Sequence, residues 1–594
     1  MLQNNQSTFV LLLALLLGAC GGGGDNGESN NPPANTPPAG FTWQPVNIKT
    51  FRFSWADVSG ATGYRLLENP DGMSGFALIA DLPAGTTTYD HVVPLHLRLN
   101  ARYLLQSCTN GNCTDQAEIA VSGNLAEAIG YIKAGNTGNL DEFGTAVALS
   151  GDGNTLAVGA PFEDADPAAG AADDTLTNAG AVYIYVRNGT TWQQQAYLKA
   201  DNADARDEFG TAVALSRNGD VLVVGAPNED ADPALGKNDN SHINSGAVYV
   251  FGRSGATWTQ TAYLKGADIT PNDNLTTTGY WFGSAVALSA AGDRLAVGAP
   301  LAVAGPASLS LAGTVFVFDL GAGGAWTQTA FLLPENQDSD DKFGYAVALS
   351  ADGKTLAASS LDEDGDAASA AGNYNDNATN AGAAYVFTDN GTAWVQQAYL
   401  KASNAGQFDQ FGKHLALSGD GATLAVGAWT EASDSRGING DGSNDNAVQS
   451  GAVYVFAKAG NMWQQQAYIK AANARRTSYF GRAVALSGDG ARLAVGAYYE
   501  NSAARGLGGD ASDTSMGQAG AAYLFSRMGG AWSQTTYIKA SNTAGLNNFG
   551  FTLSLSDDAG TLAVGAPFER SKATGVNGDQ ADNSLVQAGA VYLY

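Results

Sequence analysis

Histidine is scarce in this chain, and the motifs of several common active sites are missing. The 4 histidines, at positions 91, 96, 242 and 414, do not have the spacing of metal ligands. The chain also lacks a G-x-S-x-G nucleophile elbow and an H-E-x-x-H zinc motif. We therefore expect neither histidine-bound zinc nor a familiar hydrolase centre.

Basic residues are also few. The chain has 30 Lys and Arg against 57 Asp and Glu, which gives a formal net charge of −27. A surface this acidic repels the phosphate backbone of nucleic acids, so we do not expect nucleic-acid binding. The same surface would tolerate or recruit divalent cations, while solubility alone also explains the charge.

The apolar run near the N-terminus is too short to span a bilayer as a helix. Residues 9–17, FVLLLALLL, fit the apolar region of a secretory signal. The sequence LGAC that ends at Cys20 resembles a bacterial lipobox, which implies removal of residues 1–19 and lipidation of Cys20. By the same resemblance, Gly21 favours the outer membrane of the cell envelope. The first eight residues depart from the pattern because they contain no Lys or Arg, and an ordinary cleaved signal is the alternative.

Residues 20–40 are rich in Gly, Asn and Pro and contain almost no apolar side chains. Such a segment cannot bury enough apolar surface to fold. We expect it to act as a flexible tether between the lipid and the folded part of the chain.

Residues 41–123 contain short strand-like runs separated by turn residues, which predicts a small β-sandwich. The run WADVSGATGYRL (55–66) and residues 103–113 resemble a fibronectin type III domain, in which Trp55 and Tyr103 would be core residues. Cys108 and Cys113 flank the turn sequence TNGN. Facing strands would bring them to disulfide distance in an oxidising compartment, and two free thiols are the alternative.

An FG pair recurs seven times in the rest of the chain, 61 to 73 residues apart. The pairs begin at Phe143, Phe209, Phe282, Phe343, Phe411, Phe480 and Phe549. Each unit has four strand-like pieces joined by Asp-Gly and Asn-Gly type turns, which predicts a four-stranded antiparallel meander. One such sheet cannot cover both of its faces. Radial stacking of seven sheets therefore predicts an all-β chain with a seven-bladed β-propeller.

The two ends of the repeat array predict how the ring closes. The chain stops at Tyr594, before the seventh unit reaches its last strand. An unpaired copy of that strand, GYIKA, lies at residues 130–134, ahead of the first FG pair. We expect this copy to complete the seventh blade, so that the propeller covers residues 128–594.

The repeated pattern FG…LAVGAP…GAVYVF resembles the FG-GAP repeat of integrin α-chain propellers, in its bacterial form. The resemblance covers residues 130–594, and GAP itself is kept in four units. The other three units carry ASS (358–360), GAW (427–429) and GAY (496–498) instead. A WD40 propeller is the rival interpretation, but the seven FG pairs and the absence of Trp-Asp dipeptides favour FG-GAP.

Integrin-type repeats often carry a calcium loop before the GAP strand, which the resemblance places at residues 148–155. Only one carboxylate, Asp152, remains there, so we interpret this segment as a plain turn. The acidic loops after GAP are better candidates for Ca²⁺. In the fifth and seventh loops the candidate ligands are Asn439, Asp441, Ser443 and Asp445, and Asn577, Asp579 and Asp582. Neither loop has a distal bidentate Glu, and solvated acidic loops are the alternative.

These observations predict an exported, lipid-anchored binding, adhesion or scaffold protein whose propeller loops engage a protein or a glycan. We identify no catalytic residue. The alternatives are a carbohydrate-active enzyme on the same fold and a purely structural component of the envelope. We expect a monomer that contacts the membrane through its lipid anchor alone, with Ca²⁺ as the candidate cofactor.

Overall fold

The computed structural model describes residues 38–594, apart from 115–117, 233, 268–278, 305–308 and 367–373. The described residues form β-strands and two short 3-10 helices, η1 (Leu95–Leu97) and η2 (Ala126–Ala128). No helix in this part of the chain is long and apolar enough to cross a membrane. The predicted signal, Cys20 and most of the predicted tether lie outside the described residues.

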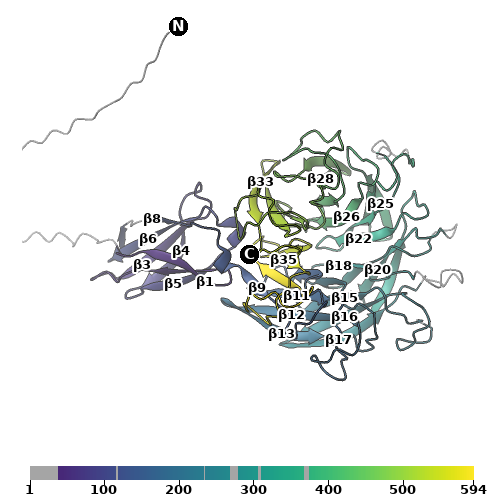
Figure 1. Ribbon diagram of the computed structural model, residues 1–594, viewed down its shortest axis with the longest axis horizontal. Helices are drawn as coiled ribbons and strands as arrows, with labels where there is room; N and C mark the ends of the chain where they lie inside the picture. The colour runs from purple at the N-terminus through teal and green to yellow at the C-terminus, as the bar shows by residue number, and fades with distance from the viewer. Residues whose placement is uncertain (1–37, 115–117, 233, 268–278, 305–308, 367–373) are drawn as a thin grey trace, which may run out of the picture.

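The N-terminal strands form two sheets, seen at the left of Figure 1. One sheet has the order β1 (Thr42–Asn47), β2 (Thr50–Ser54), β5 (Thr88–Val92). The other has the order β4 (Ala77–Pro83), β3 (Gly63–Asn69), β6 (Arg102–Thr109), β7 (Asn112–Thr114), and β8 (Glu118–Ala120) also pairs with β6. Phe53, Trp55 and Tyr103 are buried in one shared apolar cluster, so the two sheets enclose a core.

Seven four-stranded sheets follow and are arranged in a ring around a common centre (Figure 1). The first four are β10 (Ala146–Leu149), β11 (Thr155–Ala160), β12 (Ala181–Asn188), β13 (Thr191–Leu198); β14 (Ala212–Leu215), β15 (Val221–Ala226), β16 (Ala247–Ser254), β17 (Thr257–Leu264); β18 (Ala285–Leu288), β19 (Arg294–Ala299), β20 (Thr314–Leu320), β21 (Trp326–Leu332); and β22 (Phe343–Leu349), β23 (Thr355–Ser360), β24 (Ala383–Asp389), β25 (Trp394–Leu400). The last three are β26 (Phe411–Leu417), β27 (Thr423–Ala428), β28 (Ala452–Ala459), β29 (Met462–Ile469); β30 (Val484–Leu486), β31 (Arg492–Ala497), β32 (Ala521–Met528), β33 (Ala531–Ile538); and β34 (Thr552–Leu555), β35 (Leu562–Ala566), β36 (Ala590–Leu593), β9 (Gly130–Ile132). The predicted all-β, seven-bladed architecture is confirmed.

The seventh blade takes its outer strand from the start of the array. β9 pairs antiparallel with β36, and Tyr131 lies opposite Tyr592. The innermost strands contact one another around this centre, which we call the channel, and β34 contacts β10. The strand expected at residues 130–134 therefore occupies the predicted place and joins the two ends of the ring.

The FG and GAP motifs meet across the boundary between neighbouring blades. A Cβ added at Gly159, in the first GAP, would lie 2.0 Å from the carbonyl oxygen of Gly210, in the second FG. Gly210 also has a φ of 100°, which a residue with a side chain rarely adopts. The repeated glycines therefore set how closely the blades approach.

At the opposite end of the innermost strands, seven backbone hydrogen bonds form a closed ring. Gly151 N–H donates to the carbonyl of Arg217 in the next blade at 2.9 Å. The ring continues through Ala290, Ala351, Gly419, Gly488 and Asp557, whose N–H donates back to Gly151. We call this end of the channel the turn end, because the Ser-x-Asp-Gly turns lie there.

The sandwich packs directly against the sixth and seventh blades. The buried His96 contacts the carbonyl of Ala559 through Nε2 at 2.9 Å, and Thr536 donates to the carbonyl of His96 at 2.8 Å. Lys49, also buried, donates to Thr561 Oγ1 at 2.7 Å. Residues of the sandwich and of blades 6 and 7 share one apolar cluster. The sandwich is therefore a docked part of the folded unit.

Candidate functional site

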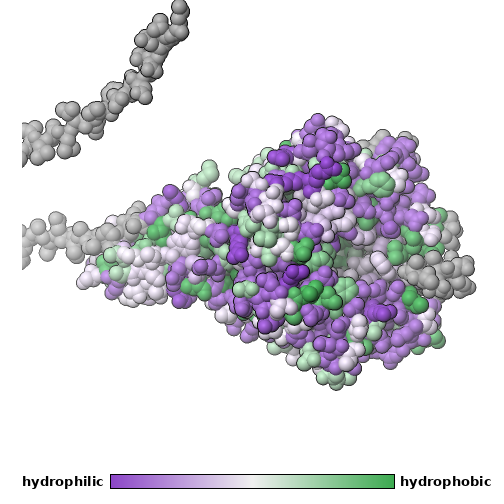
Figure 2. Space-filling view, viewed as in Figure 1, coloured by the Kyte–Doolittle hydropathy of each residue, from purple (hydrophilic) through white to green (hydrophobic). Residues whose placement is uncertain are grey.

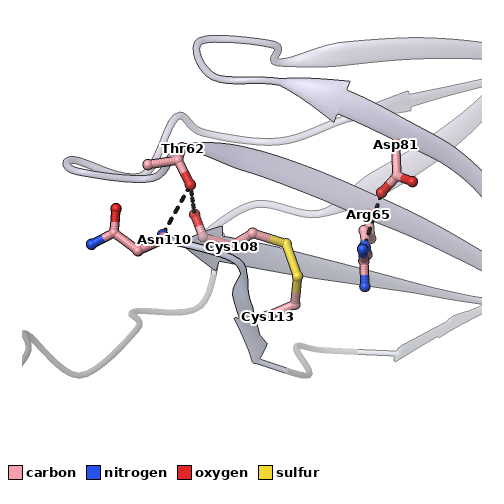
Figure 3. Close-up of a disulfide and its surroundings, with 6 residues drawn as sticks. All are labelled: Thr62, Arg65, Asp81, Cys108, Asn110 and Cys113. Carbon is pink, nitrogen blue, oxygen red and sulfur yellow. Dashed lines mark hydrogen bonds and ion pairs between the residues drawn. A yellow bond between two sulfur atoms is a disulfide. The ribbon is translucent and has the colours of Figure 1, made fainter.

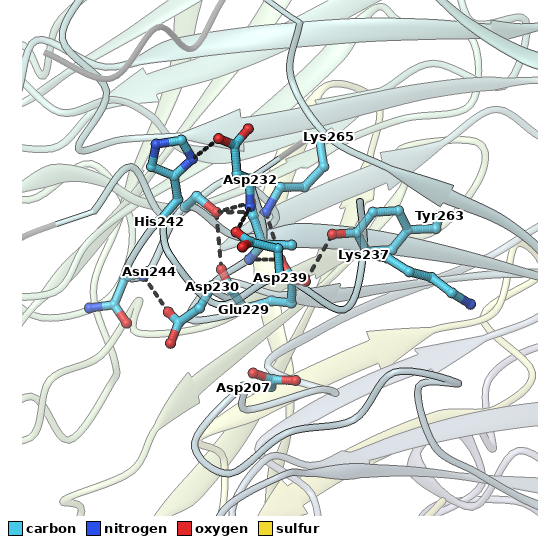
Figure 4. Close-up of polar contacts among 12 residues, drawn as sticks. Asp207, Glu229, Asp230, Asp232, Lys237, Asp239, His242, Asn244, Tyr263 and Lys265 are labelled. Atoms are coloured by element: carbon cyan, nitrogen blue, oxygen red, sulfur yellow. Dashed lines mark hydrogen bonds and ion pairs between the residues drawn. The ribbon is translucent and has the colours of Figure 1, made fainter. Parts of the chain in front are cut away.

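Each of six blades buries a Glu–Lys ion pair between the GAP strand and the outermost strand. In the second blade, shown in Figure 4, Glu229 accepts hydrogen bonds from Lys265 Nζ at 2.6 Å and from Tyr263 Oη at 2.8 Å. Asn202 Nδ2 donates to Glu229 at 3.2 Å and accepts a bond from Tyr249 Oη at 2.9 Å. The equivalent pairs are Glu163–Lys199, Glu363–Lys401, Glu431–Lys470, Glu500–Lys539 and Glu569–Lys133.

The third blade lacks this network. Ala302 replaces the Glu, Leu333 replaces the Lys, and Phe316 and Phe331 replace the two Tyr. Removing one partner of a buried ion pair is costly, whereas replacing the whole set by apolar residues is tolerated. The joint replacement indicates that these charged residues hold a blade together and do not form a binding site.

A buried Asp stands two residues before Phe in four of the FG pairs: Asp141, Asp207, Asp341 and Asp409. Burial raises the pKa of each to about 7, and the charge of the nearby Glu adds to the effect. Each carboxylate accepts a backbone N–H three residues earlier, as Asp207 does from Asp204 at 2.8 Å. The side chain therefore closes a tight turn at the FG end of the channel.

The candidate Ca²⁺ ligands lie at the periphery of blades 5 and 7. Asn439 Oδ1 accepts the N–H of Tyr468 at 2.9 Å, and Asn577 Oδ1 accepts the N–H of Tyr131 at 3.0 Å. Both asparagines therefore extend the edge of their blade.

The remaining candidates take part in local turns. Asp441 accepts Ser443 N–H at 2.9 Å, Asp579 accepts Ala581 N–H at 2.9 Å, and Asp582 accepts Ser584 N–H at 2.8 Å. Asp445 is exposed. Among the described residues, no three His, Cys, Asp or Glu side chains are grouped so as to hold a metal ion. Calcium binding at these loops stays a prediction.

Cys108 and Cys113 form a disulfide across the β6–β7 hairpin (Figure 3). Their Cα atoms are 4.0 Å apart on paired strands. Thr62 donates to the carbonyl of Cys108 at 3.2 Å and accepts the N–H of Asn110 at 3.2 Å, which fixes the start of the turn. This site is at the sandwich and contributes to its stability.

The turn end of the channel holds a cavity of about 1080 Å³ lined by residues of all seven blades. Its acidic side chains are already engaged. Asp152 accepts Ser150 Oγ–H at 2.6 Å, and Asp557 forms an ion pair with Arg217 at 2.7 Å. Asp152 thus caps the hairpin turn, in agreement with the plain turn that the sequence predicts for residues 148–155.

The FG end of the channel departs from the repeat in a way that the fold does not require. The residue after FG is Thr, Thr or Ser in blades 1 to 3, and the residue after GA is Pro in these blades. In blades 4 to 7 aromatic and basic residues take most of these positions. We call six of them the mouth cluster: Tyr345, Lys413, Trp429, Arg482, Tyr498 and Phe551.

Lys413 lies between two aromatic rings in the mouth cluster. Its Nζ is 4.6 Å from the ring centroid of Tyr345 and 4.5 Å from that of Trp429, and it donates to Tyr345 Oη. Trp429 Nε1 donates to Gln410 Oε1 at 2.7 Å, which fixes the indole. Burial and the positive charge of Arg482 lower the pKa of Lys413 well below its ordinary value.

Arg482 lies over Phe551, with its guanidinium carbon 4.1 Å from the ring centroid. Tyr498 contacts both Phe551, at 5.6 Å between centroids, and Tyr479, at 5.4 Å. Tyr479 in turn contacts Trp429 at 5.1 Å. Ring contacts therefore connect Trp429, Tyr479, Tyr498 and Phe551 in one series beside the two cations.

Comparison with family models decides the family. The FG-GAP repeat model matches residues 130–185, 192–251, 326–387, 394–456 and 463–525, which together make slightly more than half of the chain. This chain belongs to the FG-GAP repeat family. No curated protein matches this FG-GAP chain.

Solved structures resemble the FG-GAP chain at low sequence identity. A protein of unknown function from Bacteroides thetaiotaomicron is 10% identical, with a TM-score of 0.30, and the match covers 78% of this chain and 96% of that one. The polysaccharide lyase Uly1 is 10% identical, with a TM-score of 0.38 and coverage of 76% and 90%. The chicken CNTN1 FN1–FN3 domains are 8% identical, with a TM-score of 0.13 and coverage of 39% and 97%.

Reasoning from the FG-GAP sequence missed the mouth cluster. It noted the loss of GAP at residues 427–429 and 496–498 but looked for function in the acidic loops. A signal was present, because Lys413 and Arg482 each follow an FG pair, where other units carry small or aromatic residues. Only the ring closure shows that these positions, 69 residues apart, meet at one end of a channel.

Proposed function

We propose that this FG-GAP protein is an exported, lipid-anchored binding protein that engages its ligand at the FG end of the propeller channel. The mouth cluster carries this proposal. Aromatic side chains that surround a few polar or charged groups are typical of ligand sites. In the mouth cluster these residues come from only four of the seven blades. A repeat that served stability alone would not need different residues at these equivalent positions.

Several features support binding rather than catalysis. Among the described residues of the mouth cluster there is no carboxylate or histidine paired with a nucleophile. The closed ring of seven blades places the cluster at the ends of packed strands, a position where binding residues are often found. Lipidation at Cys20, the outer-membrane location and a monomeric state belong to the same proposal.

The test is a binding screen of the full chain, purified in detergent, against glycan arrays and envelope extracts. We expect a ligand whose binding falls about tenfold or more in Trp429→Ala, because a half-buried aromatic anchor is lost. Lys354→Gln, an exposed change at the turn end, is the matched control and should bind normally. A ligand that binds both variants equally would place the site elsewhere. Chemical change of the ligand would favour the enzyme alternative.

A melting experiment tests the proposed Ca²⁺ sites separately. We expect added Ca²⁺ to raise the Tm of the wild type, and to raise it less in Asp441→Asn/Asp445→Asn, because bound ligand stabilises the folded state. A wild-type Tm that is the same in Ca²⁺ and in chelator would remove the metal from the proposal.

A further inference from the structure

The two cations of the mouth cluster have no acidic partner. Within the described residues, neither Lys413 nor Arg482 is in an ion pair, and Arg482 donates no side-chain hydrogen bond. By contrast, the Lys of each buried network in the six blades described above forms an ion pair with a Glu. The chain has 57 acidic residues, so a general scarcity of carboxylates does not explain why these two cations lack an acidic partner.

The lack of a partner is costly in the free protein. Lys413 and Arg482 repel each other. Burial lowers the pKa of the neighbouring His414 to about 4, and the charges of Arg482 and Lys413 add to this effect. The acid whose charge acts on Lys413 is Asp362, and that carboxylate is already paired with Lys342. Stacking on Tyr345, Trp429 and Phe551 holds the cations in place but leaves N–H donors of both side chains unused.

The opposite side of the channel mouth has complementary chemistry. Glu142 and Glu208 stand directly before the FG pairs of blades 1 and 2, and Thr145 and Thr211 follow those pairs. Burial raises the pKa of Glu142 to about 7, and the charge of the nearby Glu208 adds to the effect. The mouth therefore has hydrogen-bond acceptors on one side and unpaired cations between aromatic rings on the other.

We propose that the mouth cluster binds a uronic-acid-containing glycan and that Lys413 and Arg482 hold its carboxylate. This inference rests on the function proposed above and names the ligand class. A sugar ring offers an apolar face to the aromatic residues and hydroxyl donors to Glu142 and Glu208. An acidic peptide would satisfy the cations but would bring more negative charge toward the two Glu.

The test compares a panel of uronic-acid trisaccharides with their methyl esters, which keep the rings and lose the charge. Calorimetry on the full chain should show at least about tenfold tighter binding of one acid than of its ester, because a charge-assisted hydrogen bond is lost in the ester. Lys413→Gln and Arg482→Gln should each reduce this difference, whereas Lys354→Gln should leave it unchanged. The two mouth variants should melt at or above the wild-type Tm, because they relieve repulsion.

Each other outcome would overturn the inference in a recognisable way. Equal binding of acid and ester, lost in Trp429→Ala, would keep the proposed function but remove carboxylate recognition. Tight binding of tetra-aspartate in place of the sugars, sensitive to Arg482→Gln, would show that the ligand is an acidic peptide. Binding of acids that no mouth variant weakens would remove both the inference and the proposed site.

Discussion

At the residue scale, the buried Glu–Lys pairs stabilise FG-GAP blades only as complete networks. The pair in blade 4, Glu363–Lys401, is buried, and Tyr399 also donates to Glu363 at 2.6 Å. A buried charge that loses its partner keeps its desolvation cost and loses its compensation. The third blade avoids this cost because all four of its equivalent residues are apolar.

We expect Glu363→Gln to lower the free energy of unfolding by roughly 3 kcal/mol, because Lys401 would stay buried without a counter-charge. The fourfold variant Glu363→Ala/Tyr385→Phe/Tyr399→Phe/Lys401→Leu copies the third blade and should recover most of this loss. Urea denaturation of the three proteins measures both effects. A fourfold variant as unstable as Glu363→Gln would contradict the network interpretation.

At the scale of the element, the turn before four of the FG pairs makes a contribution to stability that depends on pH. Asp341 is buried two residues before β22. Burial raises its pKa to about 7, and the charge of Glu363 adds to the effect. Blades 6 and 7 carry Ser478 and Asn547 at this position, so the turn does not require a charge. The Asp turns therefore favour the protonated form in the folded state.

The sign of the pH effect follows from the raised pKa. Between about pH 4 and pH 7 the folded chain keeps a proton on Asp341 that the unfolded chain releases. This contribution to stability is complete below about pH 4 and is lost as the pH rises through 7. Asp341→Asn should thus raise the Tm at pH 8 and have little effect at pH 4.

Calorimetric scans of Asp341→Asn at the two pH values measure this difference. Asp376→Asn, an exposed change in the loop of the same blade, is the matched control and should have no effect at either pH. A stabilisation of Asp341→Asn that is equal at pH 4 and pH 8 would show that charge is not the cause.

At the scale of the whole molecule, the sandwich and the propeller share one buried interface, so we expect them to unfold together. The closing strand β9 follows the sandwich directly, and Lys133, next to it, pairs with the buried Glu569 at 2.9 Å. Phe53 of the sandwich and Leu562 of the seventh blade lie in the same buried cluster. Ring closure and domain docking therefore depend on the same short segment.

Deletion of residues 130–134 should lower the free energy of unfolding by at least about 3 kcal/mol, because Glu569 would stay buried without its Lys partner. The deletion should also expose the edge of β36. We expect one calorimetric transition in the wild type and a lower, broader one in the deletion variant. A peptide of residues 128–136 added in trans should restore part of the Tm by re-forming the edge strand. A deletion variant that melts like the wild type would contradict this role of β9.

The sequence predicted the fold well because each repeat contains the local signals for its own strands and turns. The FG and GAP glycines, the Asp-Gly turns and the orphan strand at 130–134 gave the sheets, their number and the closure. It did not predict the partner of the repeated Lys, because Glu229 and Lys265 lie 36 residues apart and meet only when the outer strand folds back. It also did not predict that the sandwich docks on the propeller, because nothing local marks His96 and Lys49 as interface residues.

The sequence by itself determined the architecture, since periodicity, turn chemistry and burial act within one unit of about 60 to 70 residues. Only the tertiary structure decided which residues lie close enough together to form a binding site. The mouth cluster takes residues from blades 4 to 7, and Tyr345 and Phe551 are more than two hundred positions apart in the chain. They share one site because a closed ring places equivalent positions of all blades at the same end of a channel.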